Sequence, residues 1–593
     1  MNSFRKHTPD CSQTNVAVGQ RLFRVAVCVA AFVLTCAATA ASAQYVAVRI
    51  IAINDFHGHL EAADNTIAVP NPSSQGGMLP LRSGGAAFLA ARIAQLKTEN
   101  PRSVVVSAGD LIGASPLTSA LFHDEPTIEV MNAIGLEFSA LGNHEFDHGV
   151  SHLLRLANGG CEPQPTGNRQ SCAAADRKYP GARFPFAAAN VVHRERDEPL
   201  VAPTWIKTFD GVRIGFIGAV TRSTPGIVVP AGIRDLRFVS EAKALNEYAT
   251  QLQAQGVQAI VAVVHEGGES EGGYDGCRNP RGAIFDIVRD LHPAIDVVLS
   301  AHTHRGYNCD IDGRVVIQGA SYGRLVSVVD IEIDRTSGDV VRERTRSRNV
   351  PVPNGTGTDQ RLRTLHPPLL PDPTVAAIVE HYRKLAAPLA QQPVGRIVSE
   401  FDRRAAAGGD SALGRLIADA HLSVTQTTGA QVAFTNPGGL RADLRATGGD
   451  GVVTYADAFK SQPFGNTLVT VTLTGAQLKQ LLEQQWSATR GEHARMLQPS
   501  RGFSYTWRAG GAPGSRVIAT SMQLDGLTIE PDQRYRITVN NFLADGGDGF
   551  RVLREGNNRV GGPIDVDALT AHLKTSLASQ PLQPDTTARI VRR

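Results

Sequence analysis

Acidic and imidazole side chains stand at the end of an apolar segment near the start of the chain. The segment IIAINDFHGHL (50–60) stays apolar until Asp55, and His57 follows two residues later. A buried strand gains nothing from a charge at its end, whereas a metal ion needs oxygen and nitrogen ligands held close together. A single aspartate in this position is more often a turn or helix cap, so the hypothesis of a metal site depends on further segments.

Four other apolar segments lead into polar residues of the same kinds. They are SVVVSAGD, FSALGNHEFD, AIVAVVHEGG and IDVVLSAHTHRG, and they supply Asp110, Asn143, His265, His302 and His304. In open α/β sheets the carboxyl ends of the strands gather at one edge, where ligands bind. We therefore expect residues that are far apart in the sequence to meet there.

These residue types predict a centre for two metal ions. Mixed carboxylate and imidazole ligands favour Zn, Mn, Co and similar divalent ions, while Mg and Ca usually take oxygen ligands alone. Two ions about 3.5–4 Å apart hold the attacking and leaving oxygens of an in-line displacement and acidify a bound water. We predict that Asp110 bridges both ions, with Asp55, His57 and His304 at one and Asn143, His265 and His302 at the other.

His144 directly follows the candidate ligand Asn143, so its imidazole can face a substrate instead of a metal. Asp147 stands three residues later and is placed to fix the tautomer of His144 and favour its charged form. A cationic His144 stabilises negative charge on a phosphoryl group or protonates a leaving group. The nearby residues His59, His148, His152 and Glu266 are interpreted as surface residues or indirect supports of the ligands.

Strand-like and helix-like segments alternate through most of the chain, which predicts an α/β fold. One alternating region runs from about 45 to 339, and another begins near 394. Between them lie a polar, proline-bearing segment and the helical pattern PTVAAIVEHYRKLAAPLAQ (373–391). We predict a first domain at 44–350, a linker with a connecting helix at 351–392 and a second domain at 393–593.

Residues 1–43 have the features of a secretory signal peptide. A positive flank at Arg21 and Arg24 precedes a short apolar run, and ASAQ offers a cleavage site after Ala43. The run is shorter than the roughly 20 residues of a spanning helix, and no later segment is apolar enough to span a membrane. We therefore expect an exported protein, periplasmic or secreted, without a membrane span.

The composition of the mature chain narrows the choice of partners. The leader removes four of the 59 basic and one of the 56 acidic residues, which leaves 55 of each. This balance gives no support for binding a nucleic acid polymer, and nothing in the sequence sets the oligomeric state. Four cysteines remain, which suggests disulfides in an exported chain. Of three possible pairings we favour Cys161–Cys172 with Cys277–Cys309, and free cysteines are the alternative.

The motifs NDFHGH, SAGD, GNHEFD, VVHEGG and AHTHRG, in this order, resemble those of the calcineurin-type metallophosphoesterases. More narrowly, the chain resembles the exported 5′-nucleotidase family, which includes bacterial UDP-sugar hydrolases and animal ecto-5′-nucleotidases. The resemblance spans nearly the whole mature chain. It implies an N-terminal four-layer α/β/β/α metallophosphoesterase sandwich, a connecting helix and a C-terminal α/β nucleotide-binding domain, with the scissile phosphate between the two domains.

Three motifs of the second region carry the C-terminal part of this resemblance. TNPGGLR is similar to the family's N-x-G-G-x-R loop, QPFGN contributes a phenylalanine, and NFLADGGDGF contributes another together with an aspartate. By resemblance, the two phenyl rings sandwich a nucleobase, the aspartate accepts hydrogen bonds from the ribose, and the arginine binds phosphate. Base–aromatic stacking contributes about 1–3 kcal/mol per base, and a guanidinium fork suits phosphate. The implied substrate-binding residues are Asn436, Gly438, Arg441, Phe464, Phe542 and Asp548.

Two features depart from the family pattern. Well-known members have Asn or Gln where this chain has His304 as the fourth ligand of the first ion, which leaves the identity of the metal open. Some members also carry arginines just before the helix that LGRLIADA matches. Here Arg403 and Arg404 lie several residues earlier and stay outside the predicted site, and Arg415, inside the helix, is interpreted as structural or surface.

The resemblance and the site residues together predict hydrolysis of nucleoside 5′-monophosphates to nucleoside and phosphate. A metal centre reads only the phosphoryl group, so a 2′,3′-cyclic nucleotide phosphodiesterase with 3′-nucleotidase activity and a UDP-sugar hydrolase are alternatives on the same fold. Phenyl rings placed for a base disfavour a sulfur-ester hydrolase. A non-catalytic exported nucleotide-binding protein would be expected to lose ligands or the His144–Asp147 pair, and this chain keeps them all.

Overall fold

The computed structural model describes most of the chain, and the expected signal peptide at 1–43 lies outside the described residues. Within the part that is described, no helix is both long and apolar enough to cross a membrane. The described ranges are 44–62, 65–71, 77–163, 169–173, 178–355, 360–486 and 495–593.

The N-terminal half is built on two six-stranded sheets. The strand order is β18-β17-β1-β4-β5-β6 in the first and β15-β16-β14-β11-β9-β8 in the second. Strands such as β4 (SVVVS) and β11 (AIVAVVH) are buried along their whole length, as expected where both faces of a sheet are covered. The strands of the first sheet are β1 Tyr45–Ile53, β4 Ser103–Ser107, β5 Phe138–Ala140, β6 Phe186–Ala187, β17 Leu325–Asp334 and β18 Arg346–Pro351. Those of the second are β8 Thr204–Phe209, β9 Val212–Val220, β11 Ala259–His265, β14 Val297–Ser300, β15 Gly306–Ile311 and β16 Arg314–Gly319.

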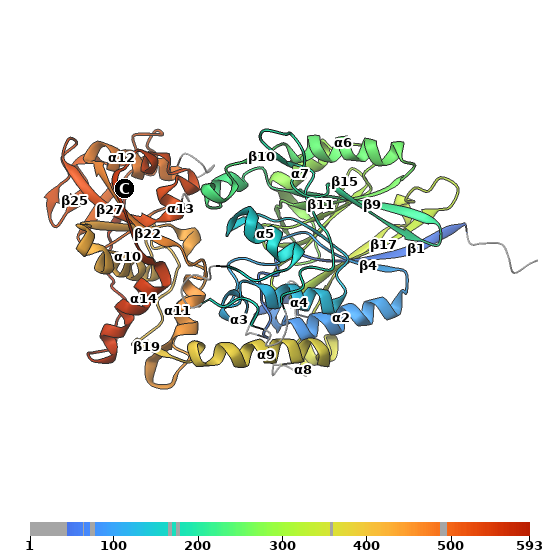
Figure 1. Cartoon of the computed structure of the whole chain (residues 1–593), viewed down its shortest axis with the longest axis horizontal. Helices are drawn as coiled ribbons and strands as arrows, with labels where there is room; N and C mark the ends of the chain where they lie inside the picture. The colour runs from blue at the N-terminus through green and yellow to red at the C-terminus, as the bar shows by residue number, and fades with distance from the viewer. Residues whose placement is uncertain are drawn as a thin grey trace, which may run out of the picture.

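Helices cover the outer face of each sheet, and an apolar layer lies between the sheets. That inner layer includes Ile50, Val106 and Val261. The expected four-layer α/β/β/α sandwich is therefore confirmed, and Figure 1 shows its helices on opposite sides of the strands. The covering helices are α2 (Ala86–Glu99), α4 (Glu125–Ile134) and α5 (Gly149–Asn158) on the first sheet, and α6 (Glu241–Ala254) and α7 (Ala283–Arg289) on the second.

One long helix, α9 (Pro373–Ala390), connects the two halves of the molecule and confirms the helix expected over 373–391. The Asp372 carboxylate caps its first turn by accepting a hydrogen bond from the Val375 N–H at 2.9 Å. The helix packs against α2 and α4 and extends toward the C-terminal half, as Figure 1 shows.

The C-terminal half contains a five-stranded sheet in the order β23-β20-β27-β22-β28. Helix α12 packs on one side of it, and α10 contacts β20 and β27 from the other. An apolar cluster around α10, α11 and α14 also includes Leu117 and Phe122 of the N-terminal half and Tyr382 of α9, so the two halves share a buried core. The elements are α10 Ala412–Thr425, β20 Val432–Thr435, α11 Tyr455–Ser461, β22 Thr467–Thr474, α12 Gly475–Glu483, β23 Gln498–Pro499, β27 Arg534–Asn540, β28 Asn557–Ile564 and α14 Asp565–Lys574, with α3 Leu117–Ala120 on the N-terminal side.

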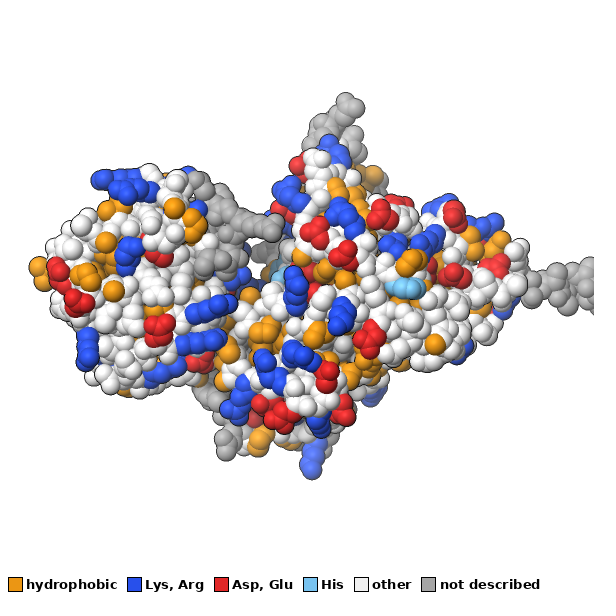
Figure 2. Space-filling model, turned by 90° about the horizontal axis from the view of Figure 1, so that it is seen from above, with side chains coloured by type: hydrophobic (Ala, Val, Ile, Leu, Met, Phe, Trp, Pro, Cys, Tyr) orange, Lys and Arg blue, Asp and Glu red, His pale blue; other side chains and the backbone are white. Residues whose placement is uncertain are grey.

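Both favoured disulfides are present, which confirms that pairing. Cys161 pairs with Cys172 in the loop after α5, and Cys277 pairs with Cys309 of β15, with Cα–Cα distances of 5.4 and 5.1 Å. On the face shown in Figure 2, Lys and Arg side chains are interspersed with Asp and Glu side chains. This mixture fits the neutral charge balance of the mature chain.

Candidate active site

The candidate metal ligands follow strands, as the sequence predicts. Asp55 follows β1 and Asp110 follows the end of β4, and these neighbouring strands are parallel. His265 is the last residue of β11, and His302 comes two residues after β14, its parallel neighbour. The loops after the two sheets meet at one end of the sandwich, and the structure brings all seven candidate ligands together there.

Five of the seven candidate ligands have a left-handed backbone conformation. Such a conformation costs an L-residue on the order of 1 kcal/mol and persists only where the surrounding structure enforces it. Strained residues of this kind cluster at functional sites, so their concentration here supports a specialised role for these loops. The five are Asp55, His57, Asp110, His302 and His304, with φ between 47° and 73°.

The first candidate ion site lies between Asp55, His57 and His304. The His57 Nδ1–H donates to the Gly113 carbonyl oxygen at 2.8 Å, which leaves a lone pair on His57 Nε2. That atom lies 3.1 Å from His304 Nε2 and 3.6 Å from Asp110 Oδ2, and His304 Nε2 lies 3.3 Å from Asp55 Oδ1. A single proton can bridge only two of these nitrogen and oxygen atoms. A metal cation can bind all of them at once, so the donor set fits a metal ion.

The second candidate ion site lies between Asp110, Asn143 and His265. The His265 Nδ1–H donates to the Ala108 carbonyl oxygen at 2.8 Å, and His265 Nε2 lies 3.0 Å from Asp110 Oδ2 and 3.2 Å from Asn143 Oδ1. His302 offers a ring nitrogen within 4.8 Å of ligand atoms of Asp110 and His265. Burial alone would lower the pKa of His265, but the Asp110 carboxylate raises it to about 10, so this pocket attracts positive charge.

Asp110 stands between the two candidate sites. Its Oδ2 atom faces both His57 and His265, while its Oδ1 atom accepts a hydrogen bond from the His144 N–H at 2.9 Å. Burial raises the pKa of Asp110, but the neighbouring His265 and His144 outweigh burial and hold the pKa well below its usual value. An ionised carboxylate shared by two clusters of ligands is what a bridging role requires.

Two buried polar residues that the sequence analysis did not single out hold the ligand loops in place. The Glu145 carboxylate accepts hydrogen bonds from three backbone N–H groups at 2.5 to 2.9 Å, including those of Asp110 and Leu111. Burial raises the pKa of Glu145 to about 7. Asn54 Nδ2 donates to Asp55 Oδ2 at 2.7 Å. A signal was present in both cases, because each residue stands directly beside a predicted site residue in the sequence.

His144 and Asp147 form the expected pair. The His144 Nδ1–H donates to Asp147 Oδ2 at 2.7 Å, which leaves Nε2 to face a substrate. Burial lowers the pKa of His144, but the carboxylates of Asp147 and Asp110 outweigh this effect and raise the pKa above its usual value. The His144 ring lies nearly parallel to that of Phe464, with 5.8 Å between centroids and 12° between planes. The pair therefore faces the C-terminal half of the molecule.

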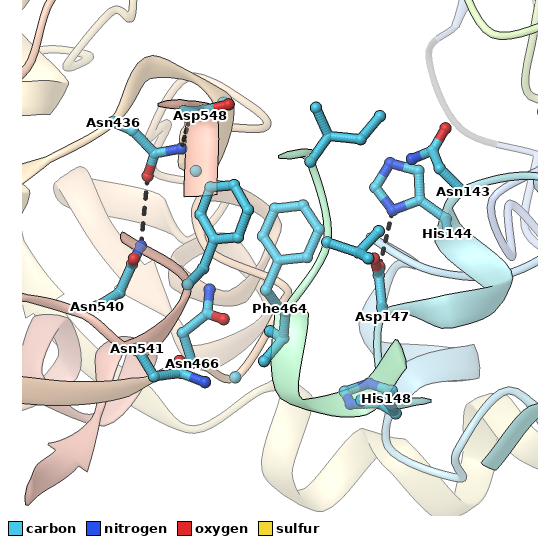
Figure 3. A pocket seen from close by; sticks show the side chains of 18 of the residues that line it. Asn143, His144, Asp147, His148, Asn436, Phe464, Asn466, Asn540, Asn541 and Asp548 are labelled. Carbon is cyan, nitrogen blue, oxygen red and sulfur yellow. Dashed lines mark hydrogen bonds and ion pairs between the residues drawn. The ribbon is translucent and has the colours of Figure 1, made fainter. Parts of the chain in front are cut away.

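A cavity of about 520 Å³ lies between the two halves. Its N-terminal wall includes Asn143 and the His144–Asp147 pair. Figure 3 shows this pair on one side, Asp548 on the other and Phe464 between them. A cavity of this size suits a small organic ligand. Its C-terminal wall contains all six predicted substrate-binding residues, which are Asn436, Gly438, Arg441, Phe464, Phe542 and Asp548.

Asp548 is buried at the C-terminal end of the cavity, and burial raises its pKa. Its carboxylate accepts a hydrogen bond from Asn436 Nδ2 at 2.8 Å and pairs with Arg495 Nη1 at 3.2 Å. Arg495 also lines the cavity, and the sequence analysis missed it. No local pattern reveals Arg495, because it belongs to none of the C-terminal motifs and meets Asp548 only in the folded chain.

Phe542 stands on the short helix α13 (Asn541–Ala544), and Phe464 stands on the loop between α11 and β22. A Cβ atom at Gly547 would stand 2.3 Å from the ring of Phe542, so a larger residue there would displace this ring. The Arg441 guanidinium carbon lies 5.7 Å from the centre of the Phe464 ring, which is within cation–π range. The predicted phosphate ligand and one predicted base platform are therefore neighbours.

Two family models match the chain, one in each half. Residues 48–306 match the calcineurin-like phosphoesterase family, and residues 388–555 match the 5′-nucleotidase C-terminal domain. The chain belongs to the 5′-nucleotidase family. As a member of that family it carries the catalytic module of a phosphoric ester hydrolase.

Relatives of this 5′-nucleotidase family member include several bacterial proteins. The chain is 32% identical over 534 residues to an endonuclease of Bacillus subtilis (strain 168), a match that covers 90% of this chain but only 40% of that protein. It is 27% identical over 600 residues to a probable 5′-nucleotidase of Treponema pallidum (strain Nichols), with 89% and 91% covered. The crystal structure of a 5′-nucleotidase precursor from Thermus thermophilus has the same fold, with a TM-score of 0.69, 24% identity and coverage of 92% of this chain and 99% of that one.

The arginines before and within α10 have other contacts in this 5′-nucleotidase family member. Among the described residues, the cavity wall includes neither Arg403 nor Arg404. Arg403 Nη1 donates to the Leu440 carbonyl oxygen at 3.4 Å. Arg415 forms a buried ion pair with Asp410 at 2.7 Å, which supports its structural interpretation.

Proposed function

We propose that this chain is an exported enzyme that hydrolyses nucleoside 5′-monophosphates to nucleoside and phosphate. The observation that carries the proposal is the shared cavity, where the His144–Asp147 pair and the ring of Phe464 face one another. A ligand that reaches from the candidate ion sites to the phenyl rings needs a phosphate at one end and a flat aromatic group at the other. A nucleotide has both.

Two divalent ions are part of this proposal. The donor atoms fit, because the N–H groups of His57 and His265 are directed at carbonyl oxygens and their Nε2 lone pairs converge on carboxylates. When bound, such ions polarise the phosphoryl group and acidify water. The imidazole of His304 adds a nitrogen donor to the first site and favours Zn, Co or similar ions over Mg. The proposed ligands are Asp55, His57, Asp110 and His304 at one ion, and Asp110, Asn143, His265 and His302 at the other.

The chain's own side chains divide the remaining work. His144, kept protonated by Asp147, donates a hydrogen bond or a proton from Nε2 to the phosphoryl or leaving oxygen. Arg441 binds the phosphate through its guanidinium fork. Phe464 and Phe542 hold the base between their rings. The other proposed contacts to the nucleoside are Asn436, Gly438 and Asp548.

The size of the cavity favours a small nucleotide over a polymer. About 520 Å³ between two walls accommodates a mononucleotide. The mixed surface charge in Figure 2 offers no continuous basic track for a phosphate backbone on the face shown. Similarity to a Bacillus endonuclease makes strand cleavage the alternative to test. The proposal of export rests on the leader-like residues 1–43 and on the two disulfides.

Turnover of a panel of phosphoesters tests the proposal. The full chain, purified with its disulfides and supplied with Zn²⁺, Mn²⁺ or Co²⁺, is assayed with AMP, 3′-AMP, 2′,3′-cyclic AMP, UDP-glucose and a single-stranded oligonucleotide. We expect the highest kcat/KM for AMP. The rate of the His144→Ala variant gives the background hydrolysis that is subtracted for each substrate. If another phosphoester in the panel has a higher kcat/KM, that compound replaces AMP as the proposed substrate. If the metal-loaded protein hydrolyses none of them, the proposed enzymatic role is contradicted.

A further inference from the structure

A second cluster of potential metal ligands lies outside the candidate active site. His123 follows α3, His152 lies in α5, and Glu162 lies in the loop closed by the Cys161–Cys172 disulfide. One potential ligand atom from each of the three lies within 4.8 Å of the others. The sequence analysis interpreted His152 as a surface or indirect residue and did not consider the other two. The proposed catalytic mechanism uses none of them.

Both imidazoles of this cluster are buried. His123 is 6% exposed and His152 is 5% exposed. In the part of the chain that the structure describes, the Nε2 atom of each ring has no hydrogen-bond partner. A buried polar atom without a partner costs about 1–3 kcal/mol, so a bound ligand would remove a real cost. Burial lowers the pKa of His123 to about 3 and that of His152 well below its usual value, which keeps both rings in the neutral state that binds metals.

The disulfide loop presents Glu162 on a fixed support. The Glu162 N–H donates to Ser171 Oγ at 2.7 Å, and Ser171 Oγ donates to Glu125 Oε1 at 2.6 Å. The Cys172 N–H donates to Glu125 Oε2 at 2.8 Å. Glu125 is itself buried at the start of α4. Both ends of the loop are therefore anchored to the same buried carboxylate, independently of any ion.

Arg155 also contacts Glu162, but its main partner is another carboxylate. Arg155 Nη1 donates to Glu125 Oε1 at 2.7 Å and to the Gly160 carbonyl oxygen at 3.0 Å. Arg155 Nε lies further away, 3.4 Å, from Glu162 Oε2. Glu125 thus balances the charge of Arg155, and the Glu162 carboxylate keeps lone pairs for a second cation.

We propose that His123, His152 and Glu162 bind one divalent ion of the Zn type. Two imidazoles and a carboxylate are a donor set that Zn²⁺ uses in proteins, with water in the fourth position. Two nitrogen ligands disfavour Mg²⁺ and Ca²⁺. Such an ion would hold the end of α3, the helix α5 and the disulfide loop together. This assignment stands independently of the substrate and chemistry of the active site.

The disulfide loop links this ion site to the C-terminal half of the molecule. Arg169, near the end of the loop, donates from Nη2 to the Phe464 carbonyl oxygen at 3.2 Å. Its Nη1 lies 2.8 Å from His148 Nε2, and the His148 ring packs edge-on against that of His152 at 5.2 Å. An ion that fixes His152 and Glu162 therefore also steadies the loop that contacts the cavity wall.

Zinc content of the full chain tests the proposal. The background variant is Asp110→Asn/His265→Ala, which lacks the proposed bridging carboxylate and one imidazole of the active site. This variant is stripped of metal with a chelator and dialysed against Zn²⁺. The number of zinc ions per chain is then measured. Adding His152→Ala should lower the content by one equivalent. Adding His381→Ala, an exposed histidine of α9, should not change it. Glu162→Gln, which keeps the side-chain shape, should weaken the affinity for Zn²⁺ at least about 10-fold.

Each outcome of this experiment decides the proposal. Equal zinc content with and without His152→Ala would overturn it. If either active-site substitution prevents folding, as judged by circular dichroism, the same difference of one equivalent is measured between the wild-type chain and His152→Ala. If His152→Ala itself fails to fold, Glu162→Gln decides, because an unchanged Zn²⁺ affinity in that variant would exclude Glu162 as a ligand.

Discussion

The two walls of the cavity are built in different ways. Behind the N-terminal wall, the candidate ligands Asp55, Asp110 and His265 are no more than 1% exposed and lie at or just after the ends of buried strands. On the C-terminal wall, Arg441 and Phe464 are only partly buried and stand on loops. The candidate ligands are thus fully enclosed, whereas these two C-terminal side chains are partly open to solvent.

This difference agrees with the proposed division of the site into a catalytic side and a substrate-recognition side. Loops tolerate substitution better than the buried ends of strands, so a change of substrate can arise in the C-terminal wall without disturbing the ligand cluster. In kinetic terms, changes to the N-terminal wall should lower kcat for every phosphoester. Changes to Phe464 and Phe542 of the C-terminal wall should raise KM for nucleotides and spare phosphoesters without a base.

The largest expected effect comes from His144→Ala. Loss of an acid–base group lowers turnover by about 10²–10⁴-fold. The loss should be equal for AMP and for ribose 5-phosphate, because His144 acts on the phosphoryl group and its leaving oxygen. Steady-state kinetics measure the loss, and elemental analysis should find wild-type metal content. Near-normal turnover by His144→Ala, or a loss of activity with AMP alone, would contradict the proposed division between catalysis on the N-terminal wall and recognition on the C-terminal wall.

Phe464→Ala and Phe542→Ala test the other wall. Each substitution should remove about 1–3 kcal/mol of stacking and raise KM for AMP about 5- to 150-fold. KM for ribose 5-phosphate should stay close to the wild-type value, since that substrate has no base. Phe542→Tyr serves as the control that keeps a ring. Equal changes for both substrates would mean that the phenylalanines shape the cavity and do not hold a base.

Arg169→Ala tests the contact that joins the two walls. The hydrogen bond from Arg169 Nη2 to the Phe464 carbonyl oxygen is worth about 1 kcal/mol. Its loss should raise KM for AMP a few-fold and leave ribose 5-phosphate unaffected, as measured by initial rates. Arg183→Ala, at an exposed arginine of the same half, is the matched control. An unchanged KM for AMP would show that the disulfide loop does not position Phe464.

The smallest expected effect concerns stability, at the start of α14. Burial raises the pKa of Asp565 to about 7, while an unfolded aspartate titrates near about 4. Its contribution to stability is therefore full at pH values below the unfolded pKa and is lost progressively as the pH rises through about 7. Asp565→Asn stays neutral, so it should raise the Tm at pH 8 by about 2–4 °C and leave it nearly unchanged at pH 4.5.

Calorimetry of metal-stripped protein measures this difference without interference from ion binding. Asp286→Asn, whose parent side chain is exposed, should shift the Tm at neither pH. Equal shifts of Asp565→Asn at both pH values would mean that the carboxyl group has an ordinary pKa in the folded chain. In that case burial would not keep the Asp565 carboxyl group neutral at pH values between its unfolded pKa and about 7.

The sequence predicts the parts of the fold and site that local patterns encode. Apolar runs that end in Asp110 or His265 predict both the strands and their convergence, because parallel strands share one carboxyl edge. The role of Phe464 and Phe542 in base stacking was predicted only from the family resemblance, because a lone phenylalanine is more often a core residue. The favoured disulfide pairing is also confirmed, and here the short spacing of Cys161 and Cys172 was the guide.

Residues defined by contacts distant in sequence could not be predicted. Arg495 meets Asp548 only after the C-terminal sheet forms. Glu162 reaches the two imidazoles because Ser171 and Cys172 anchor its loop to Glu125. Nothing in the spacing of these residues distinguishes them from surface charges, and only tertiary packing gives them a partner.

The left-handed ligand residues have a consequence for when the protein acquires its ions. Glycine adopts positive φ without steric cost, so glycine at Asp55 or His57 would give a sturdier but inert chain. With side chains there instead, the candidate ligands come together only where the loops after both sheets meet. We therefore expect a partly folded chain to lack the candidate ion sites, so that a metal ion would bind there only after the two sheets have assembled.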